Sequence, residues 1–119
     1  ALEFMSSLGA EAMRQYNHEL VWTAAHLVAE RLDTRYIVPK TMTSCMATVP
    51  LPESAGSSFE AAFELQHALL YQHKIEVPIL EIRGRLYTRL AAQVYNQISD
   101  YERLAEILAR LVGLESRGL

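Results

Sequence analysis

Residues 73–96 read HKIEVPILEIRGRLYTRLAAQVYN. The run 75–82 is rich in Ile, Val and Leu, and Pro78 predicts an edge position or a bulge because proline cannot donate to a sheet ladder. Residues 83–84 form the predicted turn, although Arg-Gly is a weaker turn signal than Asn-Gly. Residues 85–91 form the predicted returning strand. The pattern therefore predicts a β-hairpin near the C-terminal end of the chain.

Alternation along the second strand divides its side chains between two faces. One predicted face carries Leu86, Thr88 and Leu90, and the other carries Tyr87, Arg89 and Ala91. An arginine on a rigid strand holds a carboxylate well, because its planar fork donates two parallel hydrogen bonds. An arginine on the open face of a sheet is also commonly just solvated, so spacing alone leaves both readings of Arg89 open.

Helical patterns lie on both sides of the hairpin. Residues 2–8 followed by Gly9 resemble the end of a helix closed by a glycine, and 10–31 predict a long amphipathic helix. The apolar face of this long helix is expected to contain Met13, Tyr16, Leu20, Val21, Ala24 and Val28. At ~1.5 Å per residue it spans about 30 Å, as in a connector between domains. We therefore expect 1–35 to link to a missing large domain and 36–119 to be a small C-terminal domain.

Three further elements complete the expected fold. Residues 46–49 predict a short strand closed by prolines. Ser57 with Glu60, and Ser99 with Glu102, have the spacing of capping boxes that start two helices. The inner face of the first is expected to contain Phe59, Ala62, Phe63, Gln66, Leu69 and Leu70, and that of the second Tyr101, Leu104, Ala105, Leu108, Leu111 and Val112. This order predicts an α+β fold, a small mainly antiparallel sheet with helices packed on one face and a long helix before it.

Composition excludes several classes of function. The 119 residues carry a formal net charge of −3, and no basic cluster exceeds two residues in a row, so neither nucleic acid nor a membrane surface is an expected partner. No apolar run approaches the ~20 residues needed to cross a bilayer, and we see no signal peptide. A single cysteine, Cys45, suggests a reducing compartment, and we expect a cytoplasmic protein.

Most of the other reactive side chains have simple structural interpretations. The four histidines lack the spacing of a metal site, the acidic residues lie mainly on predicted solvated faces, and no metal is expected. Lys40 and Lys74 are expected to be exposed. Cys45 is expected to be a buried small residue, because no histidine or cation lies beside it in the sequence.

Four stretches resemble one enzyme family. They are MATVPLP (46–52), HKIEVPIL (73–80), GRLYTRLAAQVYN (84–96) and DYERLAEIL (100–108). Together they resemble the C-terminal small domain of pyridoxal-phosphate enzymes of the class V aminotransferase family, in its isopenicillin N epimerase-like branch. The resemblance implies the small domain of a fold type I enzyme.

The resemblance also implies residue roles. The arginine of the family's Arg-x-x-x-x-x-Tyr-Asn stretch binds the substrate α-carboxylate, and it matches Arg89, with Tyr95 and Asn96 shaping the turn that follows. The family's cofactor residues belong to the large domain and have no match here. We therefore expect the parent to be a homodimeric enzyme that uses pyridoxal phosphate on an amino-acid-like substrate, whereas this chain alone neither holds the cofactor nor turns over substrate.

An absence narrows the expected chemistry. Cysteine desulfurases of the family carry a catalytic cysteine shortly before the carboxylate-binding arginine, and residues 67–89 contain no cysteine. Epimerisation, transamination and elimination remain open. Two alternatives also remain: a free-standing, non-catalytic interaction module with the same fold, and a regulatory domain that binds small carboxylates through Arg89.

Overall fold

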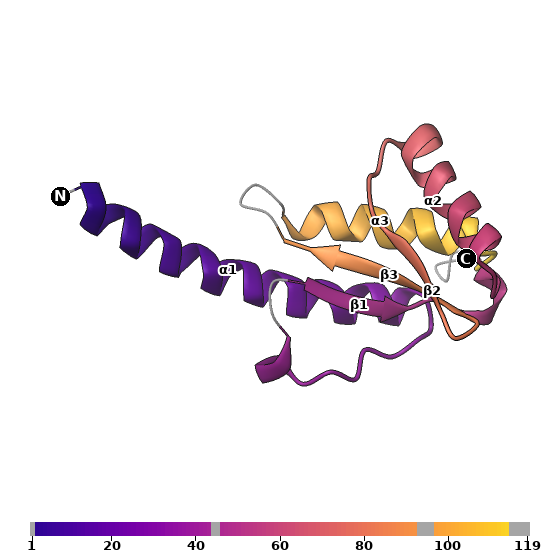
Figure 1. Ribbon diagram of the computed structural model, residues 1–119, viewed down its shortest axis with the longest axis horizontal. Helices are drawn as coiled ribbons and strands as arrows, with labels where there is room; N and C mark the ends of the chain where they lie inside the picture. Colours follow the sequence, from indigo (N-terminus) through magenta and orange to yellow (C-terminus); the bar gives the residue numbers. More distant parts are fainter. Residues whose placement is uncertain (1, 44–45, 93–96, 115–119) are drawn as a thin grey trace.

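The computed structural model describes residues 2–43, 46–92 and 97–114, with side chains from residue 9 onward. Within these residues, three helices accompany one three-stranded antiparallel sheet (Figure 1). The helices are α1 (Leu2–Arg31), α2 (Phe59–His73) and α3 (Ile98–Leu111), and the strands are β1 (Met46–Pro50), β2 (Ile79–Ile82) and β3 (Arg85–Ala91). Two 3-10 turns lie at Lys40–Met42 and Glu53–Ala55. The expected α+β fold is confirmed.

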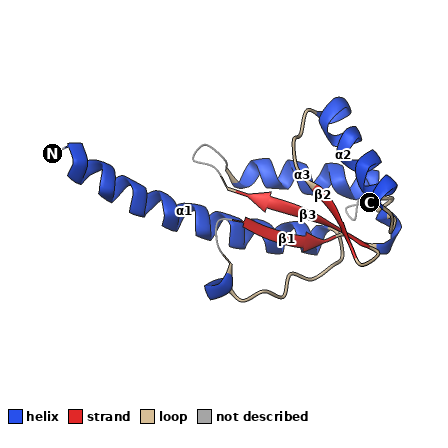
Figure 2. Cartoon of the chain, viewed as in Figure 1, coloured by secondary structure: helices blue, strands red, loops and turns tan. Residues whose placement is uncertain are grey.

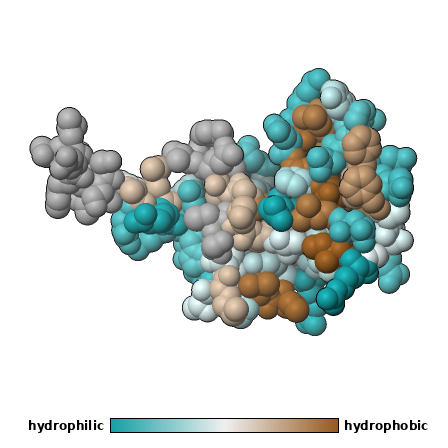
Figure 3. Space-filling model, viewed as in Figure 1, coloured by the Kyte–Doolittle hydropathy of each residue, from teal (hydrophilic) through white to brown (hydrophobic). Residues whose placement is uncertain are grey.

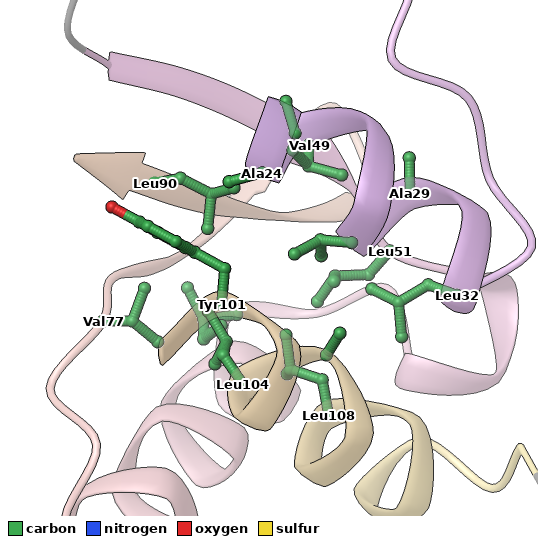
Figure 4. Packing of buried hydrophobic residues seen from close by; sticks show 14 of the residues in the cluster. Ala24, Ala29, Leu32, Val49, Leu51, Val77, Leu90, Tyr101, Leu104 and Leu108 are labelled. Atoms are coloured by element: carbon green, nitrogen blue, oxygen red, sulfur yellow. The ribbon is translucent and has the colours of Figure 1, made fainter. Parts of the chain in front are cut away.

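The sheet has the order β1-β3-β2, and α1 and α3 lie on one side of it (Figure 2). Its opposite face carries no helix among the described residues. The core lies between the sheet and these two helices, and it includes Val49 and Leu90 of the sheet and Tyr101, Leu104 and Leu108 of α3 (Figure 4). Burial of this apolar surface is the main term that holds the layers together.

The turn between β2 and β3 has the geometry that a tight hairpin requires. Both Arg83 and Gly84 have positive φ, at 52° and 79°, as in a type I′ turn, whose twist matches that of the strands. The Gly84 amide also donates to the Glu81 Oε2 at 2.7 Å. The predicted Arg-Gly hairpin is therefore confirmed.

Helix α1 corrects one prediction and confirms another. The expected glycine C-cap is wrong, because α1 runs through Gly9 without positive φ. The following residues Ala10, Glu11 and Ala12 are good helix formers, which offsets the ~1 kcal/mol helix penalty of one glycine. Leu20, Val21, Ala24 and Val28 are buried as predicted.

The prediction of a buried apolar face on α1 is wrong only at the N-terminal end of that face. Met13 and Tyr16 are exposed, where the helix projects beyond the sheet (Figure 1). The C-terminal half of the helix thus belongs to the same core as residues 46–112. The division into 1–35 and 36–119 stays a prediction. None of the described helices is long and apolar enough to cross a membrane.

Helix α2 buries a different face from the one predicted. Ala62 and Leu69 are buried as expected, together with Leu65, whereas Phe59 and Phe63 are 70% and 60% exposed. Apolar residues lie on more than one side of α2, so their spacing in the sequence does not identify the buried face. In α3, Leu111 is exposed, and the remainder of the predicted stripe is buried.

Both helix caps lie close to the predicted residues but not at them. Ser58, not Ser57, caps α2, and its Oγ accepts from the Ala61 amide at 3.1 Å. At α3 the Asp100 Oδ2 accepts from the Gln97 amide at 2.9 Å, so Gln97 replaces Ser99 as the cap. Each capping interaction spans three residues, which is the spacing predicted at a shifted position.

Candidate functional site

Arg89 lies where the sheet narrows from three strands to two. On one side it pairs with Thr48 of β1, whereas the β2 pairing ends with Ile79 opposite Thr88. The Arg89 amide still donates to the Pro78 carbonyl oxygen at 3.2 Å, but Pro78 has no N–H with which to return the bond. The predicted strand 75–82 is therefore shortened to Ile79–Ile82, and residues 75–78 leave the sheet beside Arg89.

The side chain of Arg89 lies on the open face of the sheet. Burial alternates along β3, with Leu86, Thr88 and Leu90 buried toward the helices, as the sequence predicted. Arg89 is exposed, and among the described residues its guanidinium has no hydrogen bond or ion pair. Figure 3 shows apolar and hydrophilic side chains mixed on the side of the molecule where the sheet lies in front of α1 and α3. A free guanidinium on such a face is available for an anion.

A pocket of about 740 Å³ adjoins Arg89. Its walls are the C-terminal end of α2, residues 74–78, the last residues of β3 and the first turns of α3. Lys74 and Arg103 line it together with Arg89, and Glu76 and Asp100 contribute two carboxylates. The Tyr101 hydroxyl donates to the Ala91 carbonyl oxygen at 3.1 Å, which fixes the start of α3 to the end of β3. This hydrogen bond therefore joins two of the pocket's walls.

The other candidate residues do not form a catalytic group. His18 bonds the Lys40 carbonyl oxygen at 2.8 Å through its Nε2, and His67 stacks on Tyr71 with ring centroids 4.3 Å apart. Lys40 forms an ion pair with Glu19, and this contact holds the pKa of that carboxyl below its ordinary value. In the described ranges, no three His, Cys, Asp or Glu side chains are placed to hold a metal.

Two predictions fall outside the part of the chain that the structure describes. Tyr95 and Asn96, predicted to shape the turn before the last helix, lie in 93–96, and Cys45 lies in 44–45. Their predicted roles stay predictions. Lys74 is exposed as expected, whereas Lys40 is half-exposed and forms an ion pair with Glu19.

Another ion pair, between Arg31 and Glu106, lies in a groove between α1 and α3, away from Arg89. The Arg31 Nε donates to the Glu106 Oε1 at 2.5 Å, and this hydrogen bond holds the pKa of the Glu106 carboxyl below its ordinary value. The Arg31 pKa is raised by the same bond. The contact links the two helices of the layer behind the sheet, and we assign it a structural role.

Two curated proteins are similar to almost the whole of this chain. No family model matches the sequence. The chain is 28% identical over 109 residues to hercynylcysteine sulfoxide lyase of Schizosaccharomyces pombe, with 91% of the chain and 26% of the relative covered. It is 31% identical over 124 residues to a probable chloroplastic L-cysteine desulfhydrase of Arabidopsis thaliana, with 93% and 26% covered. The chain thus spans about a quarter of the length of these relatives.

A solved structure shares the fold. The chain resembles 8-amino-7-oxononanoate synthase (bioF) from Francisella tularensis with a TM-score of 0.62 at 16% identity, over 85% of this chain and 28% of that one. At this identity the likeness shows the fold alone. The α+β architecture matches that of the small domain of a fold type I pyridoxal-phosphate enzyme, the fold that the resemblance implied.

The sequence indicates Arg89 but not the residues around its pocket. It predicts only that Lys74 is exposed and gives no signal for Arg103, because both are distant from Arg89 in the sequence. Pro78 was the one local signal for the pocket. A proline at the start of a strand next to an arginine-bearing strand indicates that the ladder ends there.

Proposed function

We propose that this chain is the small domain of a larger pyridoxal-phosphate enzyme, in the isopenicillin N epimerase-like branch of the class V aminotransferase family. In this proposal Arg89 binds the α-carboxylate of an amino-acid-like substrate. The observation that carries it is the free Arg89 guanidinium beside the end of β2, on a face with no helix over it among the described residues. Arg85, on the same strand and face, instead donates to the Leu51 carbonyl oxygen through Nε and Nη2, both at 3.4 Å.

The described residues do not fit the cofactor itself. A lysine that forms a Schiff base must lose its proton, which burial or a neighbouring cation favours. Lys40 instead faces the Glu19 carboxylate, and Lys74 is exposed. The proposal therefore gives this chain the substrate carboxylate and assigns the cofactor to the large domain, where the bound cofactor supplies the electron sink. The fold and the relatives both support pyridoxal phosphate as the cofactor of the whole protein.

Elimination is the reaction that the relatives favour. Their names describe a sulfoxide lyase of a cysteine derivative and an L-cysteine desulfhydrase. Both names imply loss of a sulfur-bearing group from a cysteine-type substrate, so we extend that reaction class to the parent of this chain as a proposal. Arg89 would orient the carboxylate. Elimination needs no catalytic cysteine, which agrees with the absence of cysteine from residues 67–89.

Exposed apolar residues on the open face of the sheet also support the proposal that a second domain covers it. Met46 and Ile82 on this face are 53% and 46% exposed, although both are large and apolar. Coverage of this surface by the large domain would exclude water from the Arg89 guanidinium and strengthen its contact with a carboxylate. We propose on the same grounds that the chain alone is inactive. The cytoplasmic location and the homodimer rest on the composition and the family resemblance.

The experiment is steady-state kinetics of the full-length protein that carries this segment, loaded with pyridoxal phosphate. L-cysteine is the first probe, with sulfide release as the readout, and L-alanine racemisation and transamination are measured in parallel. Arg89→Ala should lower kcat/KM by roughly 30-fold or more, because a bidentate charge-assisted pair is lost. Arg85→Ala is the matched control and should retain kcat/KM within about threefold. Equal kinetics of Arg89→Ala and wild type would remove the assignment.

A non-catalytic interaction module remains the second candidate, because α2 carries an unpartnered aromatic surface. Phe63, His67 and Tyr71 follow one another along its exposed side, with Phe63 and His67 rings 6.0 Å apart. The full-length protein distinguishes the two. A visible absorption band after addition of pyridoxal phosphate supports the enzyme, and its absence together with unchanged behaviour of Arg89→Ala supports the module.

A further inference from the structure

Helix α2 carries a row of aromatic side chains on the side that faces away from the core. The ring centroids of Phe63 and His67 are 6.0 Å apart, and those of His67 and Tyr71 are 4.3 Å apart. Phe63 and Tyr71 are mostly exposed, whereas Leu65 and Leu69 bury the opposite side of the helix. Exposed apolar side chains that gather in one place mark a contact with another molecule, unlike single exposed residues.

The position of α2 leaves this row accessible. The helix lies at the end of the molecule opposite the projecting N-terminus of α1 (Figure 1). Apolar side chains reach the surface over this helix (Figure 3). A second molecule can therefore approach the row without meeting α1.

Charged side chains stand at the two ends of the row. Residues 60, 67 and 74 are seven apart, and such positions follow nearly one line along a helix, with a drift of about 20° per heptad. Glu60 lies in the first turn of α2, and Lys74 directly follows its last residue. Both are exposed, and neither has an ion pair within the part of the chain that the structure describes. Glu64 adds a second exposed carboxylate to the N-terminal half.

This pattern of charges and rings is complementary to itself. If two copies of α2 lie antiparallel about a two-fold axis at His67, residues equally far from His67 on either side face each other. Phe63 then faces Tyr71 of the second copy, and Glu60 faces Lys74 of the second copy. A parallel arrangement would instead place like charges together at both ends, and like charges repel. The charges therefore favour a second copy in the antiparallel orientation.

The exposed apolar area suits a reversible contact. Phe59, one turn before Phe63, is also largely exposed and extends the row. At ~200 Å² for one aromatic side chain, the exposed parts of Phe59, Phe63 and Tyr71 amount to roughly 400 Å² per copy. A specific interface buries about 800 Å² per partner, of which somewhat more than half is apolar. The row approaches this apolar share without exceeding it, as in a weak dimer.

We propose that a second copy of this chain docks on α2, antiparallel about His67, and forms a reversible dimer. The aromatic rows of the two copies bury each other, and two ion pairs between Glu60 and Lys74 close the ends of the contact. The homodimer expected for the parent names no contact surface, and this proposal assigns one within the present chain. It depends neither on the role of Arg89 nor on pyridoxal phosphate.

The test is sedimentation equilibrium of the 119-residue chain at low salt, from about 10 µM to about 1 mM. Wild type should show a monomer–dimer equilibrium with a Kd on the order of 100 µM, as the small apolar area implies. Phe63→Ser should raise this Kd about tenfold or more. Thermal unfolding of each variant checks that the fold is kept, which the exposure of the substituted side chains favours.

A charge exchange tests the orientation. Glu60→Lys and Lys74→Glu should each raise the Kd about fivefold or more, because every pair occurs twice in a two-fold dimer. The double variant Glu60→Lys/Lys74→Glu exchanges the two ends and should return the Kd to within about twofold of wild type. Glu102→Lys is the matched control, since it reverses an exposed glutamate on α3, and it should leave the Kd unchanged.

Each result decides for or against the proposal. Recovery in the double variant supports it, because the two positions lie about 21 Å apart along one helix and cannot pair within one copy. A chain that stays monomeric to 1 mM overturns it, and a large domain or a different protein is then the occupant of the row. A dimer unaffected by Phe63→Ser forms through another surface and also overturns it. Failure of the double variant to recover overturns the antiparallel contact.

Discussion

Arg85 and Arg89 share one face of β3, but their guanidinium groups have different surroundings. Arg85 donates to the Leu51 carbonyl oxygen at the end of β1, and Arg89 has no such acceptor among the described residues. Both side chains are exposed, and both arise from the same regular strand. The difference arises at the strand ends. Leu51, the residue after β1, lies beside Arg85, whereas the pairing of β3 with β2 stops at Thr88, one residue before Arg89.

This difference predicts opposite effects on stability and binding. Arg89→Ala should change the free energy of unfolding by no more than about 0.5 kcal/mol, because an exposed side chain without contacts is removed. Arg85→Ala should destabilise by roughly 0.5–1 kcal/mol through loss of two long hydrogen bonds. Urea denaturation of the 119-residue chain measures both. A loss above ~1.5 kcal/mol in Arg89→Ala would mean that the arginine is structural.

A second prediction follows from the missing backbone N–H of Pro78. Pro78→Ala supplies the N–H that a hydrogen-bonded antiparallel pair with Arg89 requires, so β2 should lengthen by one residue. The new amide at position 78 should then be protected from hydrogen exchange, at a level similar to that of the Arg89 amide. Hydrogen exchange followed by NMR checks this. Free exchange at position 78 would show that residues 75–78 leave the sheet for a reason other than proline.

The hairpin and α3 were predictable because their signals are local. Two positive-φ positions at Arg83 and Gly84 follow from an Arg-Gly pair between alternating runs, and the α3 stripe is amphipathic over several turns. The exposed Phe59 and Phe63 were not predictable, because α2 has apolar residues on several sides and only the packed structure decides among them. The continuation of α1 through Gly9 follows from helix propagation over a long segment, which outweighs one unfavourable residue.

The candidate site was predictable only in part. Arg89 was found through its strand position and the family resemblance, and its face follows from the alternation of β3. Its neighbours Lys74 and Arg103 depend on the packing of the α2 end against α3, which no local pattern encodes. The contact of Arg103 with the His73 carbonyl oxygen spans 30 residues of sequence.

The ion pair between α1 and α3 predicts a pH-dependent contribution to stability. The Arg31 hydrogen bond lowers the pKa of Glu106 in the folded state, so the folded protein binds a proton there less readily than the unfolded chain. The contribution is therefore present above the ordinary glutamate pKa of about 4.3 and is lost as pH falls through the lower folded value. Glu106→Gln should destabilise by about 1 kcal/mol at pH 7, since the pair is partly exposed.

The measurement is urea denaturation of wild type and Glu106→Gln between pH 7 and pH 3. The difference between them should shrink as pH falls below about 4.3. Glu102→Gln, an exposed glutamate on the same helix, is the control and should show a smaller effect at every pH. A difference that stays constant across this range would contradict the sign derived from the depressed pKa.

The loop before α2 depends on the absence of a side chain at residue 56. Gly56 has a φ of 106°, and a Cβ placed there would lie 2.7 Å from the Cβ of Ala61. Gly56→Ala therefore adds backbone strain and a close contact, and it should destabilise by about 2–3 kcal/mol. Gly9→Ala is the matched control, because Gly9 is helical and has no atom within 4 Å of an added Cβ. It should leave stability unchanged or raise it by up to ~1 kcal/mol.

A double variant separates the two causes at Gly56. Ala61→Gly removes the atom that the new Cβ would meet but leaves the backbone strain, so Gly56→Ala should cost less in this background than in wild type. The size of the remaining loss reports the strain of a positive φ alone, about 1–2 kcal/mol. If Gly56→Ala destabilises both backgrounds equally, the close approach of the loop to α2 contributes nothing, and the glycine is required only for its backbone conformation.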